Sequence, residues 1–271
     1  METTGGAMNH YHSKLVDDKG RVEWSEEENS VWADLYARQY PLVKDRACQA
    51  YIDGLSILNL PKDRVPQIEE INKTLVKQTG WRLAPVPALI SFDRFFELLA
   101  NKQFPVATFL RSREEFDYLQ EPDFFHEVFG HCAMLTNPDF AHFTQTYGAL
   151  GQQSNHEQRV YLARLYWFTV EFGLLKEKGE NKIYGGGILS SPGETVYALD
   201  SANPIHDVFS LDKVLRTPYR IDIMQPIYFV IEDLKTLYHL NMNEIMNSVD
   251  KAMLAGLFPP LFEKKEVLDA K

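Results

Sequence analysis

The chain has 271 residues, 45% of them hydrophobic, and its 38 acidic side chains against 28 Lys and Arg give a net charge of −10. This length and apolar content suit one large domain with its own core. The acidic balance, without any dense run of Lys or Arg, argues against nucleic acid as a partner. No apolar run approaches the roughly 20 residues that cross a bilayer, so we also expect no membrane partner.

The N-terminal stretch METTGGAMNHYHSK lacks the basic-then-apolar order of a signal peptide. Without an export signal, we expect the two cysteines, Cys48 and Cys132, to be free thiols in the cytoplasm. Residues 1–20 are polar and aperiodic, which predicts a flexible N-terminal segment ahead of one domain over 21–271.

Helix signals dominate the first half of the chain. Ser25, followed three residues later by Glu28, forms a capping box and predicts a helix that ends near Pro41. Ser91 is the predicted N-cap of another helix. The helices expected after Pro41 span 43–57, 66–79 and 92–101.

The second half mixes helix and strand signals. Asn137-Pro138-Asp139 predicts a helix start, with an N-cap, Pro at the first position and an acid in the first turn. Ser154 and Glu157 form a capping box whose helix is expected to continue through Glu171 to about Lys178. Helical signal returns from about 235 until Gly256, and short strands are predicted at 104–110, 195–200 and 227–233. The predicted fold is therefore mainly α with a few short β-strands.

Two histidines in the sequence HEVFGH, His126 and His131, are five residues apart. On a regular helix a step of four residues separates side chains by about 40°, whereas a step of five separates them by about 140°. To converge on one ion, the backbone must bend, stop or distort between them, most easily at Gly130. Taken alone, this spacing is weakly specific, and one packed and one solvated histidine is the commoner arrangement.

A carboxylate in an apolar helix adds support for a metal site. Glu171 lies within YLARLYWFTVEFGLLK (161–176), and its neighbours three and four residues away are Trp167, Phe168, Leu174 and Leu175. Without a basic neighbour, this carboxylate is neutral, paired at a distance, bound to a cation, or reaches solvent at the helix edge. Two histidines and a carboxylate match the facial triad of non-heme Fe(II) oxygenases, although zinc hydrolases use the same ligand types.

The blocks EPDFFHEVFGH, YWFTVEFGLLK and GGGILSSPGE, together with TGWRLAPVPALI (79–90), resemble the pterin-dependent aromatic amino acid hydroxylase family. The similarity runs from roughly Val22 to about residue 235, with matching spacing between the blocks. It implies the single-domain catalytic fold of that family over 21–271, as in its short bacterial, catalytic-domain-only members. It also implies Fe(II) and a tetrahydropterin, either tetrahydrobiopterin or a bacterial analogue, as cofactors, and a monomer or a dimer.

By this resemblance the iron ligands are His126, His131 and Glu171. Glu127 matches a glutamate near the pterin and the open iron positions, and it is the candidate catalytic residue. Phe95 matches the ring on which the pterin stacks. The residues expected at the pterin site are Leu89, Ile90, Phe95, Glu127, Ala163 and Tyr166.

The resemblance also implies a site for the amino acid substrate. Arg111 matches the arginine that binds the substrate carboxylate, and Ser190 matches a serine close to it. Trp167 matches the ring beside the substrate side chain, and Pro122 and Gly187 line the same pocket. Gly187 belongs to the run 185–187, which lacks the Lys of a phosphate loop and which we interpret as flexible backbone.

The favoured reaction is hydroxylation of L-phenylalanine to L-tyrosine with O₂ and the pterin. Trp167 fits phenylalanine and tyrosine hydroxylases better than tryptophan hydroxylases, and Ile221 falls where tyrosine hydroxylases carry an acid. Leu119 departs from the threonine of animal phenylalanine hydroxylases, so fine substrate contacts differ there. The alternatives are tyrosine or tryptophan hydroxylation and, in other classes, a zinc hydrolase with Glu127 as base or a non-catalytic metal- or pterin-binding protein.

Overall fold

The computed structural model describes residues 11–117, 119 and 121–263. The first half of the expected flexible segment, residues 1–10, lies outside this description. Within the second half, the Lys14 N–H donates to the Thr108 carbonyl at 2.8 Å, and Val16 forms a β-bridge with Val22. The division of the chain into 1–20 and 21–271 stays a prediction.

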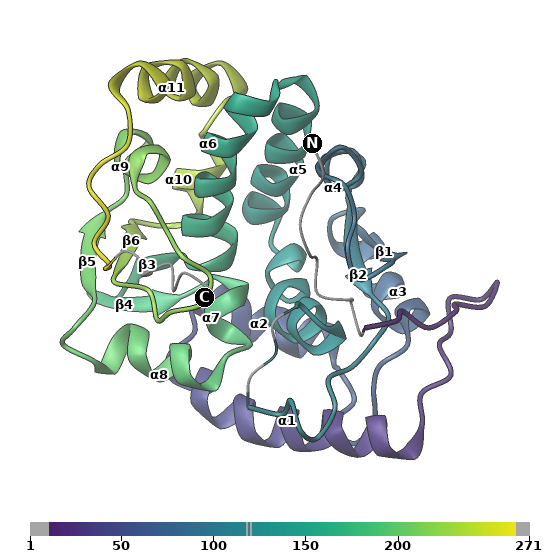
Figure 1. The fold of residues 1–271 in the computed structure, drawn as a ribbon. Coiled ribbons are helices and arrows are strands. Elements are labelled where there is room, and N and C mark those ends of the chain that lie inside the picture. Colours follow the sequence, from purple (N-terminus) through teal and green to yellow (C-terminus); the bar gives the residue numbers. More distant parts are fainter. Residues whose placement is uncertain (1–10, 118, 120, 264–271) are drawn as a thin grey trace, which may run out of the picture.

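The chain is mainly helical with short strands, which confirms the predicted fold class (Figure 1). The α-helices are α1 (Glu26–Lys44), α2 (Gln49–Leu58), α3 (Ile68–Gln78), α4 (Phe92–Ala100), α5 (Pro138–Gln153), α6 (His156–Tyr166), α7 (Gly186–Leu189), α8 (Pro192–Asp200), α9 (Leu211–Arg216), α10 (Leu234–Tyr238) and α11 (Met242–Ala255). Two π-helices, η1 (His126–Cys132) and η3 (Trp167–Glu171), and one 3₁₀-helix, η2 (Met134–Thr136), complete the helical elements of the described residues.

The strands form two small sheets. One is the parallel pair of β1 (Arg82–Val86) and β2 (Gln103–Ala107). The other has the order β4-β3-β6-β5. In it β3 and β4 are antiparallel, and β6 runs parallel to both β3 and β5. Its strands are β3 (Leu174–Glu177), β4 (Glu180–Ile183), β5 (Ile205–Val208) and β6 (Ile227–Ile231).

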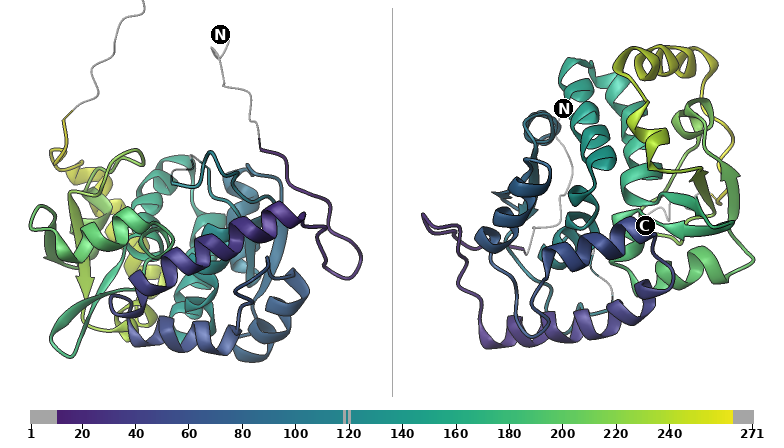
Figure 2. Two further views of the ribbon diagram at one scale, coloured as in Figure 1. Left: turned by 90° about the horizontal axis from the view of Figure 1, so that it is seen from below. Right: turned by 180° about the vertical axis from the view of Figure 1, so that it is seen from behind.

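Figures 1 and 2 show α5 and α6 between the two sheets, with α1 crossing one end of the molecule. A continuous buried core extends from Val22 to Ala252 and joins both sheets to the central helices. Among the described residues, no helix combines the length and apolarity needed to cross a bilayer. Cys48 and Cys132 are free, as predicted, and both are buried.

The helix-start signals at Ser25, Ser91 and Asn137 are confirmed. Ser25 Oγ accepts a hydrogen bond from the Glu28 N–H, and the Glu28 carboxylate accepts one from the Ser25 N–H. Asn137 Oδ1 likewise accepts from the first-turn N–H groups of α5. The first helix, however, continues through Pro41 to Lys44, where burial of Val43 extends its apolar face.

One predicted strand and two predicted helices are wrong. The segment 195–200 is helix α8 and not a strand, because Ser191 caps it and Pro192 occupies its first turn. The helix predicted over 43–57 begins only at Gln49, because the Cys48 N–H pairs with the Ile183 carbonyl instead.

The helix predicted through Glu171 to Lys178 is also corrected. Asn155 and Gln158, and not Ser154 and Glu157, form its capping box. Helical structure ends at Glu171, and the chain enters β3, which pairs with β6, at Leu174. That pairing is distant in the sequence, so helical periodicity could not reveal it.

Candidate metal centre

The π-helix η1 carries both histidines of HEVFGH. Because π-helical hydrogen bonds join residues five apart, residues i and i+5 lie one above the other along such a segment. The Nε2 atoms of His126 and His131 are therefore only 3.2 Å apart. The backbone distortion that the spacing requires is spread over one whole helical segment and is not a bend at a single residue.

Gly130 has a different structural role from the predicted one, which was to allow the backbone to bend. Its backbone is not in the left-handed region, so it does not supply conformational freedom. Instead, a Cβ at this position would lie 2.6 Å from the carbonyl oxygen of Gly186. Gly130 therefore allows α7 to pack directly against η1.

A second π-helix, η3, presents Glu171 to the same point. It is closed by a hydrogen bond from the Phe172 N–H to the Trp167 carbonyl at 2.8 Å. Glu171 Oε2 lies 3.7 Å from Nε2 of His126 and 3.4 Å from Nε2 of His131.

These separations suit a single metal ion. One ligand atom from each of the three residues lies within 4.8 Å of the others. Metal–ligand bonds of about 2.1 Å at right angles place neighbouring ligand atoms about 3 Å apart. The donor set, two imidazoles and one carboxylate on one side of the ion, is that of a facial triad.

Hydrogen bonds orient the His126 ring. Its Nδ1 lies 2.8 Å from Ser190 Oγ, and that hydroxyl lies 2.9 Å from the carbonyl oxygen of Gly186. The hydroxyl proton goes to the carbonyl, so Nδ1–H donates to Ser190 and the Nε2 lone pair faces the cluster. Burial lowers the pKa of His126 to about 4, although the negative charge of Glu171 acts in the opposite direction. The lowered pKa keeps the ring neutral and able to bind a metal.

The glycines of 185–187 serve close packing and not flexibility, which corrects the sequence-based interpretation. None of the three has a left-handed backbone. A Cβ on Gly186 would lie 2.4 Å from the His131 ring, and one on Gly187 would lie 3.0 Å from Glu171 Oε2. The Gly187 N–H also hydrogen-bonds Glu171 and helps to lower the pKa of that carboxyl.

Arg111 is buried and forms a two-pronged ion pair. Its Nε and Nη2 donate to the two carboxylate oxygens of Asp123, both at 2.9 Å, and its backbone N–H donates to the same group at 3.0 Å. Since a guanidinium has five N–H groups, three remain for another anion. Burial alone would raise the pKa of Asp123, but Arg111 outweighs it and the pKa is lowered.

Asp123 is a residue that sequence reasoning missed. Its carboxylate also accepts a hydrogen bond from the backbone N–H of His126 at 3.0 Å. It therefore connects Arg111 to the first turn of η1. The available signal was an acid three residues before His126, in the position of a helix N-cap.

Glu127 lies next to His126, but the three-residue metal cluster does not include it. Burial raises its pKa to about 8, and Glu171 adds to the rise while His131 opposes it. On the predicted pterin side, the rings of Phe95 in α4 and Tyr166 in α6 meet edge to face, with centroids 5.4 Å apart.

The remaining predicted site residues differ in exposure. Leu89, in the loop between β1 and α4, is 66% exposed. Pro122 is also exposed, whereas Ile90 and Ala163 are half-buried. Trp167 is half-buried between Phe172 and Tyr219 and donates from Nε1 to the Gln225 side chain.

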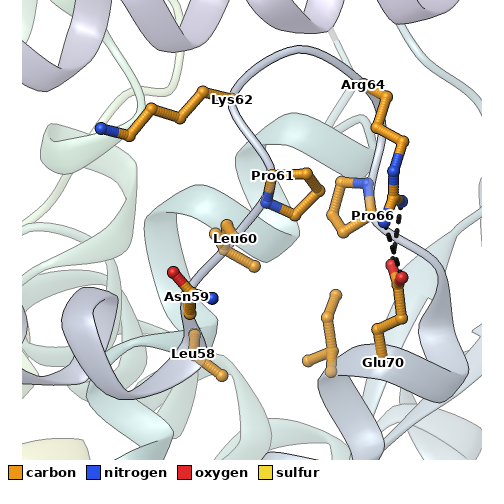
Figure 3. A pocket seen from close by; sticks show the side chains of 9 residues that line it. Leu58, Asn59, Leu60, Pro61, Lys62, Arg64, Pro66 and Glu70 are labelled. Atoms are coloured by element: carbon orange, nitrogen blue, oxygen red, sulfur yellow. Dashed lines mark hydrogen bonds and ion pairs between the residues drawn. The ribbon is translucent and has the colours of Figure 1, made fainter.

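A cavity of about 420 Å³ lies elsewhere, along the segment that joins α2 to α3. Figure 3 shows the side chains that line it. Of its three charged lining residues, Arg64 and Glu70 pair with each other through hydrogen bonds of 2.7 and 3.0 Å, and the third is Lys62. None of its lining residues belongs to the metal cluster or to the predicted pterin and substrate sites.

Comparison with known proteins gives consistent matches. Residues 3–271 match the profile of the family described as "Biopterin-dependent aromatic amino acid hydroxylase". A phenylalanine-4-hydroxylase of Vibrio cholerae is 64% identical over 260 residues, which are 96% of this chain and 90% of that protein.

Two solved structures are also similar. The cold-active phenylalanine hydroxylase of Colwellia psychrerythraea 34H is 54% identical, with a TM-score of 0.90 over 92% of this chain and 97% of that one. The Chromobacterium violaceum phenylalanine hydroxylase with bound oxidised Fe(III) is 40% identical, with a TM-score of 0.85 over 93% and 94% of the two chains.

Proposed function

The chain belongs to the biopterin-dependent aromatic amino acid hydroxylase family, and from that premise we propose that it hydroxylates L-phenylalanine to L-tyrosine with O₂ and a tetrahydropterin. The observation that carries the proposal is the convergence of His126, His131 and Glu171 on one point. It occurs in a chain that resembles a phenylalanine-4-hydroxylase over 96% of its length.

Fe(II) fits these ligands. Two neutral imidazoles and a carboxylate gathered on one side of an ion leave other coordination positions open. The same proposal makes His126, His131 and Glu171 the iron ligands. Bound there, iron would supply the chemistry of oxygen activation.

The chain's own residues would orient the two organic molecules. Arg111 keeps three N–H groups for the substrate carboxylate, while Asp123 holds the guanidinium in place. Trp167, four residues before Glu171, would form a wall of the substrate pocket with Pro122, Gly187 and Ser190. Holding the substrate ring next to the metal in this way lowers the entropic part of the barrier.

The pterin would lie on the side of Phe95. That ring is half-buried against Tyr166, so it offers a face to a flat heterocycle. Leu89, Ile90 and Ala163 would line the same side. We place Glu127 there because it neighbours His126 yet lies outside the metal cluster.

The test is anaerobic reconstitution with Fe(II), followed by O₂, a tetrahydropterin and each of phenylalanine, tyrosine and tryptophan. We expect tyrosine from phenylalanine as the main product, dependent on iron and pterin together. A preference for either of the other amino acids would reassign the substrate within the family. Hydrolytic activity with zinc alone, or binding without product, would reject the proposed reaction.

A further inference from the structure

Trp167 is held in its plane by two aromatic neighbours. Its ring centroid lies 4.4 Å from that of Phe172, at an interplanar angle of 28°, and 4.4 Å from that of Tyr219, at 16°. Stacking of this kind fixes the plane of an indole but leaves it free to slide or turn within the plane. A directional contact at the ring edge is needed to fix its position.

Gln225 provides that contact. The Trp167 Nε1–H donates to Gln225 Oε1 at 3.0 Å. Gln225 is 1% exposed, so water does not compete for this hydrogen bond.

The orientation of the Gln225 amide is determined by its other partners. Its Nε2 donates to the carbonyls of Arg220 and Ile223, both at 2.9 Å. Turning the amide over would place its oxygen against these two acceptors and its NH₂ against the indole donor, with the loss of all three hydrogen bonds. Oε1 therefore always faces Trp167.

The backbone of Gln225 is anchored as well. Its N–H donates to the buried carboxylate of Glu194 at 3.0 Å, and the Tyr228 hydroxyl donates to the same carboxylate. Tyr219, the stacking partner of Trp167, lies in the same segment before β6 as the two carbonyls that Gln225 binds. One side-chain amide thus ties the indole to the segment that carries its stacking partner.

We propose that Gln225 is a positioning residue that acts through Trp167 to set the width of the amino acid pocket. This inference rests on the proposed function, which places Trp167 beside the substrate side chain. A fixed indole gives the pocket a rigid wall that admits a single aromatic ring. Without Gln225 the wall would move, so binding of phenylalanine would weaken and a larger side chain would be rejected less strongly.

The first test needs no substrate, metal or pterin. The indole N–H signals of the four tryptophans are observed by ¹⁵N NMR of the full chain, and Trp167→Phe identifies the signal of Trp167. In Gln225→Leu we expect that signal to shift and its exchange with solvent to accelerate. Gln67→Leu is the matched control. The Gln67 amide also forms two kinds of hydrogen bond, since its oxygen accepts from the Val22 N–H and its NH₂ donates to the Val22 carbonyl, but neither involves Trp167.

The second test measures kinetics with the reconstituted enzyme. For Gln225→Leu we expect KM for phenylalanine to rise roughly tenfold with a smaller change in kcat, and the preference for phenylalanine over tryptophan to fall by a similar factor. In the Trp167→Phe background, Gln225→Leu should add little to either change, because its effect passes through the indole N–H.

The results discriminate clearly. If Gln225→Leu loses stability as Gln67→Leu does, yet keeps wild-type indole exchange and substrate preference, Gln225 is only structural and the inference is wrong. If the wild-type enzyme makes no tyrosine, the proposed function fails. That failure is separate, because the exchange of the Trp167 indole proton is measured without turnover.

Discussion

Two glutamates of this chain, the half-buried Glu171 and the buried Glu194, have opposite surroundings. The carboxylate of Glu194, on the regular helix α8, is satisfied by structural donors, the Tyr228 hydroxyl and the Gln225 N–H. The carboxylate of Glu171, at the end of a π-helix, faces the Nε2 atoms of two histidines. Burial of a carboxylate by itself therefore does not indicate a metal site. The chemical type of the neighbouring groups, here two imidazoles, indicates it.

The pKa values follow the same division. Burial raises the pKa of Glu194, and its two hydrogen bonds reverse only part of that rise. At Glu171 burial acts in the same direction, but His131, His126 and the Gly187 N–H outweigh it, so the pKa is lowered. The site around Glu171 stabilises a negative charge that is available to a cation, whereas the site around Glu194 stabilises a structural contact.

The largest expected effect comes from removing the carboxylate at the metal centre. Glu171→Ala should lose Fe(II) and form much less tyrosine. Removing a residue that only hydrogen-bonds a metal ligand lowers metal affinity or activity roughly 10–100-fold, and we expect a larger decrease in tyrosine formation here because a ligand itself is removed. Iron content and product are measured after identical anaerobic loading, with Glu194→Gln as the matched variant that should retain iron. Full iron content and normal product formation in Glu171→Ala would contradict the ligand assignment.

This comparison also shows what the sequence could not decide. Glu171 was singled out because its neighbours three and four residues away are all apolar and none is basic. Glu194 also has no basic neighbour, although its corresponding neighbours, Ser190, Ser191, Tyr197 and Ala198, include polar residues. The lack of a basic neighbour therefore does not distinguish a ligand from a structural carboxylate, and the longer family motifs were needed to predict Glu171 as an iron ligand.

The fold was predictable where the determinants are local. The caps at Ser25 and Asn137 lie where expected because each depends on a few adjacent residues. The π-helices were not predicted as such, although the spacing of the two histidines required some distortion. Their hydrogen-bond shift depends on packing between distant segments, such as α7 against Gly130.

A smaller effect is expected from crowding the metal centre without removing a ligand. In Gly186→Ala the new Cβ would lie 2.4 Å from the His131 ring, which is held against the core and cannot retreat. We expect a loss of about 1–3 kcal/mol in the free energy of unfolding, as for other overpacked sites, together with weaker Fe(II) binding.

Urea unfolding and Fe(II) titration measure these two quantities. The control is Gly193→Ala, whose Cβ would meet only the end of the flexible Met224 side chain at 2.8 Å. Equal stability and equal iron affinity in the two variants would show that the approach of Gly186 to His131 is not needed for the site.

The smallest expected effect is a pH dependence that belongs to Glu194 and not to the metal centre. Because its pKa is raised in the folded state, Glu194 contributes most to stability while it is protonated, below its unfolded pKa. That contribution is lost as the pH rises through the folded pKa. Glu194→Gln cannot ionise, so its advantage relative to the wild type should grow as the pH is raised from about 4.5 towards neutrality.

The measurement is the difference in unfolding free energy between the two metal-free proteins at several pH values, which cancels the titration of the other groups that they share. A difference independent of pH would mean that Tyr228 and Gln225 compensate the buried charge completely. In that case the site around Glu194 would accept a negative charge as readily as water does, whereas the site around Glu171 favours that charge. The contrast between the two glutamates would then be smaller, and Glu194 would no longer favour the neutral form.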